Sequence, residues 1–209
     1  MSGLRTRREK EVAQRSPLDA DEEPVDLEEA SDEGDEGPAP SIGPAWPAPV
    51  EVPAPEGPAV IRPAQEADLP ALVAFEISIA RISFPRDAVT DPAVHEKKLR
   101  KALERGEPGM FVLVRAGQVL GWLWAAFNTN FLTNEHYATF RSLAVDDAAP
   151  DHAALAEALF NYGIGYAQEA GMLEITGKVH VHNTPMRLLY KKAGFEAEHL
   201  TMKLPLTNA

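Results

Sequence analysis

The clearest chemical pattern in the sequence lies near its carboxyl end, in the run from Asn183 to Phe195. Six residues separate Asn183 from Tyr190, and three more separate Tyr190 from Gly194 and Phe195. A tyrosine hydroxyl can give a proton to a leaving group and so act as a general acid. Part of the run also has a structural explanation, because Asn183 suits the start of a helix and Gly194 the position just after its end. That explanation does not account for the position of Tyr190.

Two carboxylates are candidates for the matching general base. Glu76 lies on the apolar side of an expected helix, and Glu135 directly precedes an expected strand. A positioned carboxylate can act as a general base and take up a proton. Each of the two could equally be a solvated or ion-paired side chain, and ordered water could remove the proton instead.

Two further pairs of residues are expected to share one face of a strand, His180 with His182 and Trp122 with Trp124. A metal site would need a third ligand, and the sequence has no cysteine, so no metal is predicted. The histidines are expected to pack or to line the site. The tryptophans either pack against the sheet or form an aromatic wall for a substrate.

An ordered α/β domain is needed to position these residues, and hydrophobic periodicity predicts one over residues 58–209. Strands are expected at 59–62, 110–115, 118–127, 136–145 and 173–181, with a final strand or pair within 195–206. Helices are expected from Asp68 to Pro85, from Asp91 to Gly106, over 152–170 and from Asn183 to Gly194. Consecutive strand, helix and strand imply a parallel pair, so the sheet is expected to be mixed.

Residues 1–57 are predicted to form a disordered acidic and proline-rich tail. They carry 15 Asp or Glu against 5 Lys or Arg, whereas the remaining residues carry 17 against 15. Prolines crowd residues 37–58, which favours an extended chain over a packed core. The tail is either a solvated linker or an arm that binds a partner, with Trp46 as an anchor. The nearly neutral domain lacks the basic surface that nucleic acid would require.

The sequence has no run of 18 or more apolar residues and no secretory signal, so no association with a membrane is expected. The absence of cysteine fits a reducing compartment. A cytoplasmic location is therefore predicted.

The Asn183–Phe195 run and the order of elements together resemble the GNAT family of N-acetyltransferases, from Ala59 to about Leu206. The resemblance implies the GNAT-like acyltransferase fold, an α/β (α+β) arrangement around a mixed sheet. It implies that acetyl-CoA, without a metal, donates an acetyl group directly to a primary amine on a small molecule or a protein. Homodimers are common in the family.

The resemblance also implies a site. In the family two parallel strands splay apart, here 136–145 and 173–181, and the pantetheine arm binds to the backbone of the first. The residues implied to bind the cofactor there are Leu143, Ala144, Val145, Asn183 and Tyr190, and Tyr190 is also the implied general acid. The strand position that often holds the base is Thr139, which leaves Glu135 and Glu76 as substitutes.

The loop that holds the pyrophosphate in the family aligns with residues 151–156, where the implied contacts are His152, Ala153, Ala154, Leu155 and Ala156. This loop departs from the family pattern, since Asp151 replaces a basic or amide residue and Ala154 replaces a glycine. Asp151 is expected to cap the helix and to occupy donors that a phosphate would need. The alternative function is therefore a weak or inactive GNAT-fold module for interaction or ligand sensing.

Overall fold

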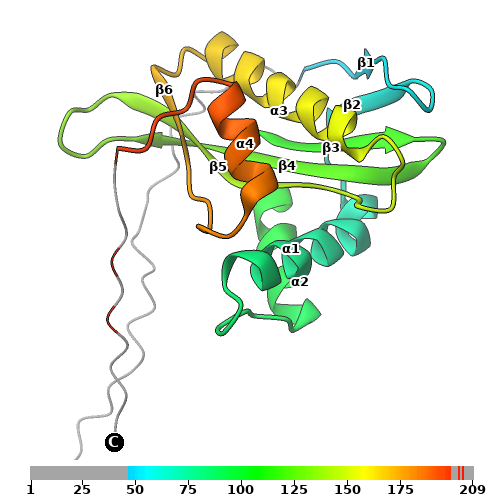
Figure 1. Ribbon diagram of the computed structural model, residues 1–209, viewed down its shortest axis with the longest axis horizontal. Coiled ribbons are helices and arrows are strands. Elements are labelled where there is room, and N and C mark those ends of the chain that lie inside the picture. Colours follow the sequence, from blue (N-terminus) through cyan, green and yellow to red (C-terminus); the bar gives the residue numbers. More distant parts are fainter. Residues whose placement is uncertain (1–46, 199–201, 203, 205–209) are drawn as a thin grey trace, which may run out of the picture. The chain divides into compact units, whose positions relative to one another are not determined.

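The computed structural model describes residues 47–198, Met202 and Leu204 (Figure 1). Its centre is a six-stranded sheet in which every strand lies beside the next one in sequence. The strands are β1 (Val50–Val52), β2 (Ala59–Pro63), β3 (Met110–Arg115), β4 (Gln118–Thr129), β5 (His136–Val145) and β6 (Glu174–Gly177). The helices are the short 3-10 helix η1 (Glu66–Asp68), α1 (Leu69–Ser83), α2 (Pro92–Glu104), α3 (His152–Glu169) and α4 (Thr184–Lys192).

The sheet is mixed, as the sequence predicts. Strands β1 to β5 pair in antiparallel fashion, whereas β5 and β6 are parallel and are connected through α3. The hairpin between β3 and β4 turns at Ala116 and Gly117, both with positive φ (48° and 80°), as a tight primed turn requires. The predicted order of strands β2 to β6 and of the four α-helices is confirmed.

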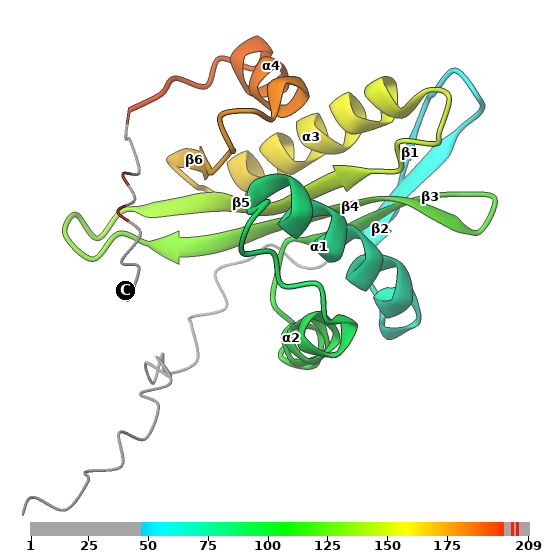
Figure 2. The same ribbon diagram turned by 60° about the horizontal axis from the view of Figure 1, so that its bottom comes forward.

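Helices cover both faces of the sheet, with α1 and α2 on one face and α3 and α4 on the other (Figure 2). The α3 face packs through Phe111, Leu123, Phe140, Leu159 and Phe160, all buried. The α1 face packs through a second cluster, and its members include Leu69, Leu72, Leu99, Met110 and Trp122. Each face therefore has its own apolar core, and the sheet separates the two.

Two of the predicted helix caps form, at Asp91 and Asn183, and two do not, at Asp68 and at Asp151, which is described with the site. Asp91 accepts a hydrogen bond from Ala93 N (2.9 Å), and Asn183 accepts one from Met186 N (3.2 Å). Asp68 occupies the position before α1 without capping it. Its carboxylate instead accepts two hydrogen bonds from Arg62 (2.7 and 2.8 Å) and one from Gln65 N (2.8 Å).

The ends of the sheet also differ from the prediction. β6 stops at Gly177, so the expected strand over 173–181 is only half formed, because the chain turns at His180–Asn183 to start α4. Residues 195–198, Met202 and Leu204 are not in a strand, and the rest of the expected final strand lies outside the described residues.

The strand β1 lies within the segment that the sequence assigns to the tail. Val50–Val52 pairs with Ala59–Ile61 at the edge of the sheet. Prolines 49 and 53 flank it, and proline is tolerated at a sheet edge because no neighbouring strand needs its missing N–H. Residues 1–46, which include the acidic block and Trp46, lie outside the part of the chain that the structure describes.

Candidate active site

The site is organised by a change in the pairing of β5. On one side β5 pairs with β4 as far as Val145, whereas on the other side its pairing with β6 ends at Phe140 and Gly177. At the same place β5 contains a bulge, since Trp124 and Ala125 of β4 oppose Ser142 and Phe140, and Arg141 has no partner across the ladder. Bulges bend a strand and re-aim its side chains. On the side away from β4, residues 141–145 of β5 therefore have no neighbouring strand within the described chain.

This edge contains the three residues predicted to bind the pantetheine arm, Leu143, Ala144 and Val145. Leu143 is buried against the α3 face, and Ala144 and Val145 are half-buried. Pairing between the two parallel strands ends at Phe140 and Gly177, where β6 itself ends, so the second strand is shorter than expected.

Tyr190 lies beside the last paired residue of β6. Its hydroxyl is so close to Gly177 that an added Cβ there would come within 2.4 Å of it. The ring stacks on Phe195 with centroids 4.7 Å apart and packs against Phe160. Burial raises the pKa of Tyr190 to about 12, so its hydroxyl stays protonated at neutral pH.

Glu76 reaches the same part of β5 from the opposite face of the sheet. Its Oε1 accepts a hydrogen bond from Trp122 Nε1 (2.7 Å) and a short one from Ser142 Oγ. The other carboxylate oxygen has no partner among the described residues. The structure thus fixes this half-buried carboxylate next to the bulge and leaves one oxygen for a further donor.

Glu135 is placed elsewhere. It is exposed in the turn between β4 and β5, where its carbonyl accepts a hydrogen bond from Asn130 N (2.8 Å). Arg141 lies six positions further along the chain, which in an extended strand spans about 20 Å. Thr139, at the family's usual base position, hydrogen bonds with Thr176 (2.9 Å) and Asn128 (3.1 Å).

The first turn of α3 follows the free end of β5. His152, Ala153 and Ala154 are exposed there, and the side chain of Leu155 is buried in the core. The N–H groups of His152 and Ala154 make turn hydrogen bonds, whereas that of Ala153 has no partner within residues 47–198. An exposed helix start of this kind attracts anions through its N–H groups and dipole.

Asp151 does not cap α3, contrary to the sequence-based expectation. Its buried carboxylate accepts two hydrogen bonds from Arg115 of β3 (3.1 and 2.7 Å) and one from Glu56 N (3.2 Å). Arg115 holds the pKa of Asp151 below its usual range. The negative charge of Asp151 is therefore compensated within the fold, and its carboxylate takes no hydrogen bond from the first turn of α3, whose Ala154 and Leu155 N–H groups donate to its backbone carbonyl.

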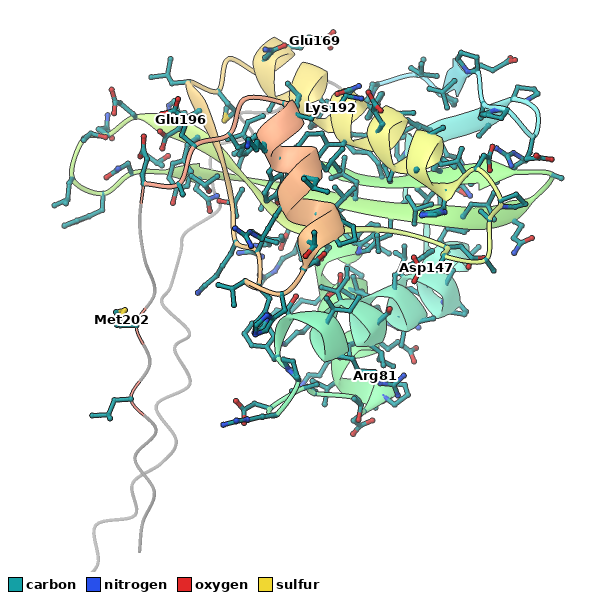
Figure 3. All side chains as sticks on the ribbon, viewed as in Figure 1. Arg81, Asp147, Glu169, Lys192, Glu196 and Met202 are labelled. Atoms are coloured by element: carbon teal, nitrogen blue, oxygen red, sulfur yellow. The ribbon has the colours of Figure 1, made fainter. Side chains whose placement is uncertain are left out.

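The other charges near this end are partly compensated. Asp146 accepts a hydrogen bond from Ala148 N (3.0 Å), and Asp147 is exposed in the β5–α3 connection (Figure 3). Lys192, also labelled in Figure 3, links α4 to α3 through an ion pair with Glu157 (2.6 Å). Asn183 uses its side-chain oxygen to cap α4.

The two histidines are not on a strand, which corrects the sequence-based assignment. His180 and His182 lie in the turn before α4, with ring centroids 5.2 Å apart. Among the described residues, no group of three or more metal-binding side chains comes together. Trp122 is fully buried in the α1-side core, so it packs the sheet, and Trp124 is only half-buried.

Three residues of this region were missed by the sequence reasoning, namely Arg115, Arg141 and Ser142. Each acts through a contact with a residue far away in the sequence, which no local spacing reveals.

In the described part of the chain, none of the helices is both long enough and apolar enough to cross a bilayer.

The fold has many structural relatives. A possible acetyltransferase from Clostridium difficile 630 matches with a TM-score of 0.59 and 17% identity over 72% of this chain and 99% of that chain. A predicted acetyltransferase with acetyl-CoA from Clostridium acetobutylicum has a TM-score of 0.57 and 14% identity over 71% and 96%. The ribosomal-protein-alanine N-acetyltransferase from Brucella melitensis has a TM-score of 0.56 and 14% identity over 71% and 99%.

Sequence comparison identifies the family of the chain. No curated protein sequence matches the chain. The model of the acetyltransferase (GNAT) family matches residues 75–195, more than half of the 209 residues, and this range includes β5, α3 and Tyr190. The chain therefore belongs to the acetyltransferase (GNAT) family.

Proposed function

We propose that this protein is an acyl-CoA-dependent N-acetyltransferase that moves an acetyl group from acetyl-CoA to a primary amine. One observation carries the proposal. Tyr190 and Glu76 approach the same short stretch of β5, residues 140–142, from opposite faces of the sheet. A proton donor and a proton acceptor thus flank the point at which β5 and β6 stop pairing.

Acetyl-CoA would be held on the α3 side of that point. The unpaired edge of β5 at Leu143–Val145 offers backbone groups to the pantetheine arm, and the exposed first turn of α3 offers the N–H group of Ala153 and the positive end of the helix dipole to the pyrophosphate. Compensation of Asp151 by Arg115 favours this fit, because the helix start then keeps its attraction for an anion. His152 adds a side-chain donor on the same exposed turn.

The amine would enter from the α1 side and attack the thioester carbonyl carbon directly. Glu76, with one carboxylate oxygen unoccupied, would accept the proton that the amine loses. The carbon–sulfur bond then breaks, and the Tyr190 hydroxyl would protonate the departing thiolate. Its raised pKa of about 12 keeps that hydroxyl in the donor form over the whole neutral range.

Transfer can be tested directly by mixing the full-length protein with acetyl-CoA and a panel of primary amines. Release of free CoA thiol is then followed with a thiol reagent, and the acetylated amine is identified by mass. Because the chain has no cysteine, the protein itself gives no thiol signal. Thiol release that depends on the amine supports the proposal, and its absence across the panel contradicts it.

The assignment of the base has its own test in two matched variants. Glu76→Gln should lower kcat about 100-fold or more, as expected on loss of a general base. Glu135→Gln removes the same charge from the exposed turn and should leave kcat within about twofold, since general-base catalysis requires hydrogen-bond reach of the reacting proton. Equal effects of the two variants would overturn the role of Glu76.

A second candidate function is a GNAT-fold module that binds a ligand or partner without efficient transfer. The observation in its favour is the first turn of α3, where Ala154 adds a Cβ at the family's glycine position and no Lys or Arg lies between Ser142 and Gly177. Saturable acetyl-CoA binding with no amine-dependent thiol release would favour this module.

A further inference from the structure

Arg141, the residue at the bulge of β5, is an unpaired cation beside the proposed reaction point. Its side chain is exposed, and its guanidinium carbon lies 5.0 Å from the centroid of the Trp124 ring. Within the described residues no carboxylate lies at ion-pair distance from it. By contrast, Arg62 and Arg115 hold buried aspartates at 2.7 Å, and Arg100 pairs with Glu66 and Glu96.

A chain of contacts places Arg141 in the same cluster as Glu76. Glu76 bonds to Ser142, the next residue after Arg141, and to Trp122. The centroid of the Trp122 ring lies 6.3 Å from that of Trp124, and the guanidinium of Arg141 lies over the Trp124 ring. Both tryptophans belong to the core on the α1 side of the sheet. Arg141 and Glu76 therefore lie on the face opposite to Tyr190 and α3.

A position over an indole ring suits a guanidinium that binds a ligand. It restricts the side chain while leaving the N–H edges of its planar group open, and these edges match the two oxygens of a carboxylate. An anion bound there belongs to the acceptor and not to CoA, because the proposed phosphate site is on the α3 side.

We infer that Arg141 binds a carboxylate of the acceptor, so that the substrate class is an amine that also carries a carboxylate. Glu76 and Arg141 then recognise opposite ends of the same molecule. Glu76 attracts the ammonium end and repels the carboxylate, and Arg141 does the reverse. The inference rests on the proposed function, since it names the acceptor of that same site.

The test uses matched pairs of acceptors with the full-length protein. Short amino acids with α- or ω-amino groups are each compared with the corresponding carboxamide, which keeps the amine and removes the negative charge. The variants are Arg141→Gln, which removes the cation, and Arg141→Lys, which keeps charge without the planar fork. Arg105→Gln, an exposed arginine at the end of α2, is the matched control.

Wild type should prefer the carboxylate member of at least one pair. Arg141→Gln should lower kcat/KM for that member about 10-fold to 100-fold, as for loss of a hydrogen-bonded charge pair, and leave the carboxamide unaffected. Arg141→Lys should retain part of the preference, and Arg105→Gln all of it. A variant that lowers both members equally, or neither, would overturn the inference.

Calorimetric binding of the same pairs in the presence of CoA separates this inference from the proposed function. Carboxylate binding that is lost in Arg141→Gln, without turnover, would overturn the function and support the role of Arg141. Turnover that is indifferent to Arg141 would overturn the inference alone, as would failure of every carboxylate in the panel to bind. Thermal melts of both Arg141 variants confirm that each is folded.

Discussion

At the scale of single residues, the site combines side chains whose surroundings suit opposite tasks. Tyr190 packs against the rings of Phe160 and Phe195, and this burial raises the pKa of its hydroxyl to about 12. Glu76 has two donors on one oxygen and none on the other. A protonated donor and an open acceptor on the two sides of one strand are what proton transfer at neutral pH requires.

Replacing Tyr190 by phenylalanine should affect turnover and not stability. The hydroxyl makes no hydrogen bond to the described residues, so its removal should leave the unfolding midpoint close to that of wild type. Loss of the general acid should lower kcat about 100-fold or more, with an unchanged Kd for acetyl-CoA. Steady-state kinetics, calorimetry and a thermal melt measure the three quantities.

Tyr162→Phe is the control for removing a buried hydroxyl. The Tyr162 hydroxyl is buried and has no hydrogen-bond partner among the residues that the structure describes. Deleting an unsatisfied polar group should stabilise the fold by about 1 kcal/mol and leave kcat unchanged. If Tyr190→Phe behaved like Tyr162→Phe in every measurement, Tyr190 would have no part in the chemistry.

Sequence reasoning identified the residues whose structural roles depend on neighbours close to them in the sequence. The spacing of Asn183, Tyr190 and Gly194 follows one helix, and the structure has Asn183 at its cap and Gly194 past its end at φ 89°. It failed at Asp151, where local rules predict a cap. The carboxylate instead pairs with Arg115, which is 36 residues away in sequence, and such a partner is visible only after folding.

At the scale of elements, α3 carries the site and must lie close to the sheet. Gly163 makes this approach possible, since an added Cβ would come within 2.7 Å of Leu123 and 3.1 Å of Phe140. Gly165, two residues further along the same helix, has no such neighbour within 4 Å. The position of the first turn of α3 thus depends on one small residue in its middle.

The two glycines should respond oppositely to alanine. Gly163→Ala should lower the free energy of unfolding by about 1–3 kcal/mol, because the core around Leu123 and Phe140 is closely packed. Gly165→Ala should raise it by about 0.5–1 kcal/mol, because alanine is a better helix former than glycine. Urea unfolding gives both values, and equal effects would contradict the close contact of α3 with the sheet.

A negative charge added to the first turn of α3 should weaken acetyl-CoA binding while it stabilises the helix. Ala153→Glu is expected to stabilise the helix by about 0.3–1 kcal/mol through the dipole. The same carboxylate would repel the pyrophosphate and should weaken acetyl-CoA binding about 10-fold or more, consistent with loss of one favourable charged contact. Calorimetry and thermal melts measure the two effects.

The control is Asn161→Glu, which puts the same charge on an exposed position further along α3. It should leave the Kd for acetyl-CoA unchanged. If Ala153→Glu bound acetyl-CoA as tightly as Asn161→Glu, the start of α3 would not hold the phosphates.

Element boundaries were predictable where periodicity is strong. Strands β3 and β5 and helix α3 appear where the sequence predicts them, because their apolar residues repeat over many positions. β6 is shorter than predicted, since the alternation through His180 and His182 continues into a turn. β1 was missed because proline-rich flanks conceal a short edge strand, whose existence depends on its partner β2.

At the scale of the whole domain, the sheet lies between the proposed acetyl-CoA site and the proposed acceptor site. Both sites adjoin the place where β5 and β6 stop pairing. The α3 side offers the helix start and strand edge proposed for acetyl-CoA, and the α1 side offers Glu76 and Arg141. The two substrates could then meet without competing for space. The fold and family were within reach of the sequence, whereas the identity of the acceptor depends on contacts between elements.

The buried tyrosines make the stability of the domain sensitive to alkaline pH. In the folded protein the pKa of Tyr190 is raised from 10 to about 12, so its contribution is complete below pH 10 and is lost between pH 10 and about 12. For Tyr190 this loss is about 2–3 kcal/mol. Urea unfolding across this range should show a smaller loss for Tyr190→Phe than for wild type, and identical slopes would contradict the burial of its hydroxyl.

The most direct test of the central claim is a calorimetric titration of acetyl-CoA into the full-length protein, with a thermal melt alongside. We expect saturable binding at a single site, and at about 100 times the Kd the ligand should stabilise the fold by about 2.7 kcal/mol. Absence of binding and of any shift in the melt at millimolar acetyl-CoA would contradict the claim that β5 and the start of α3 hold an acyl-CoA.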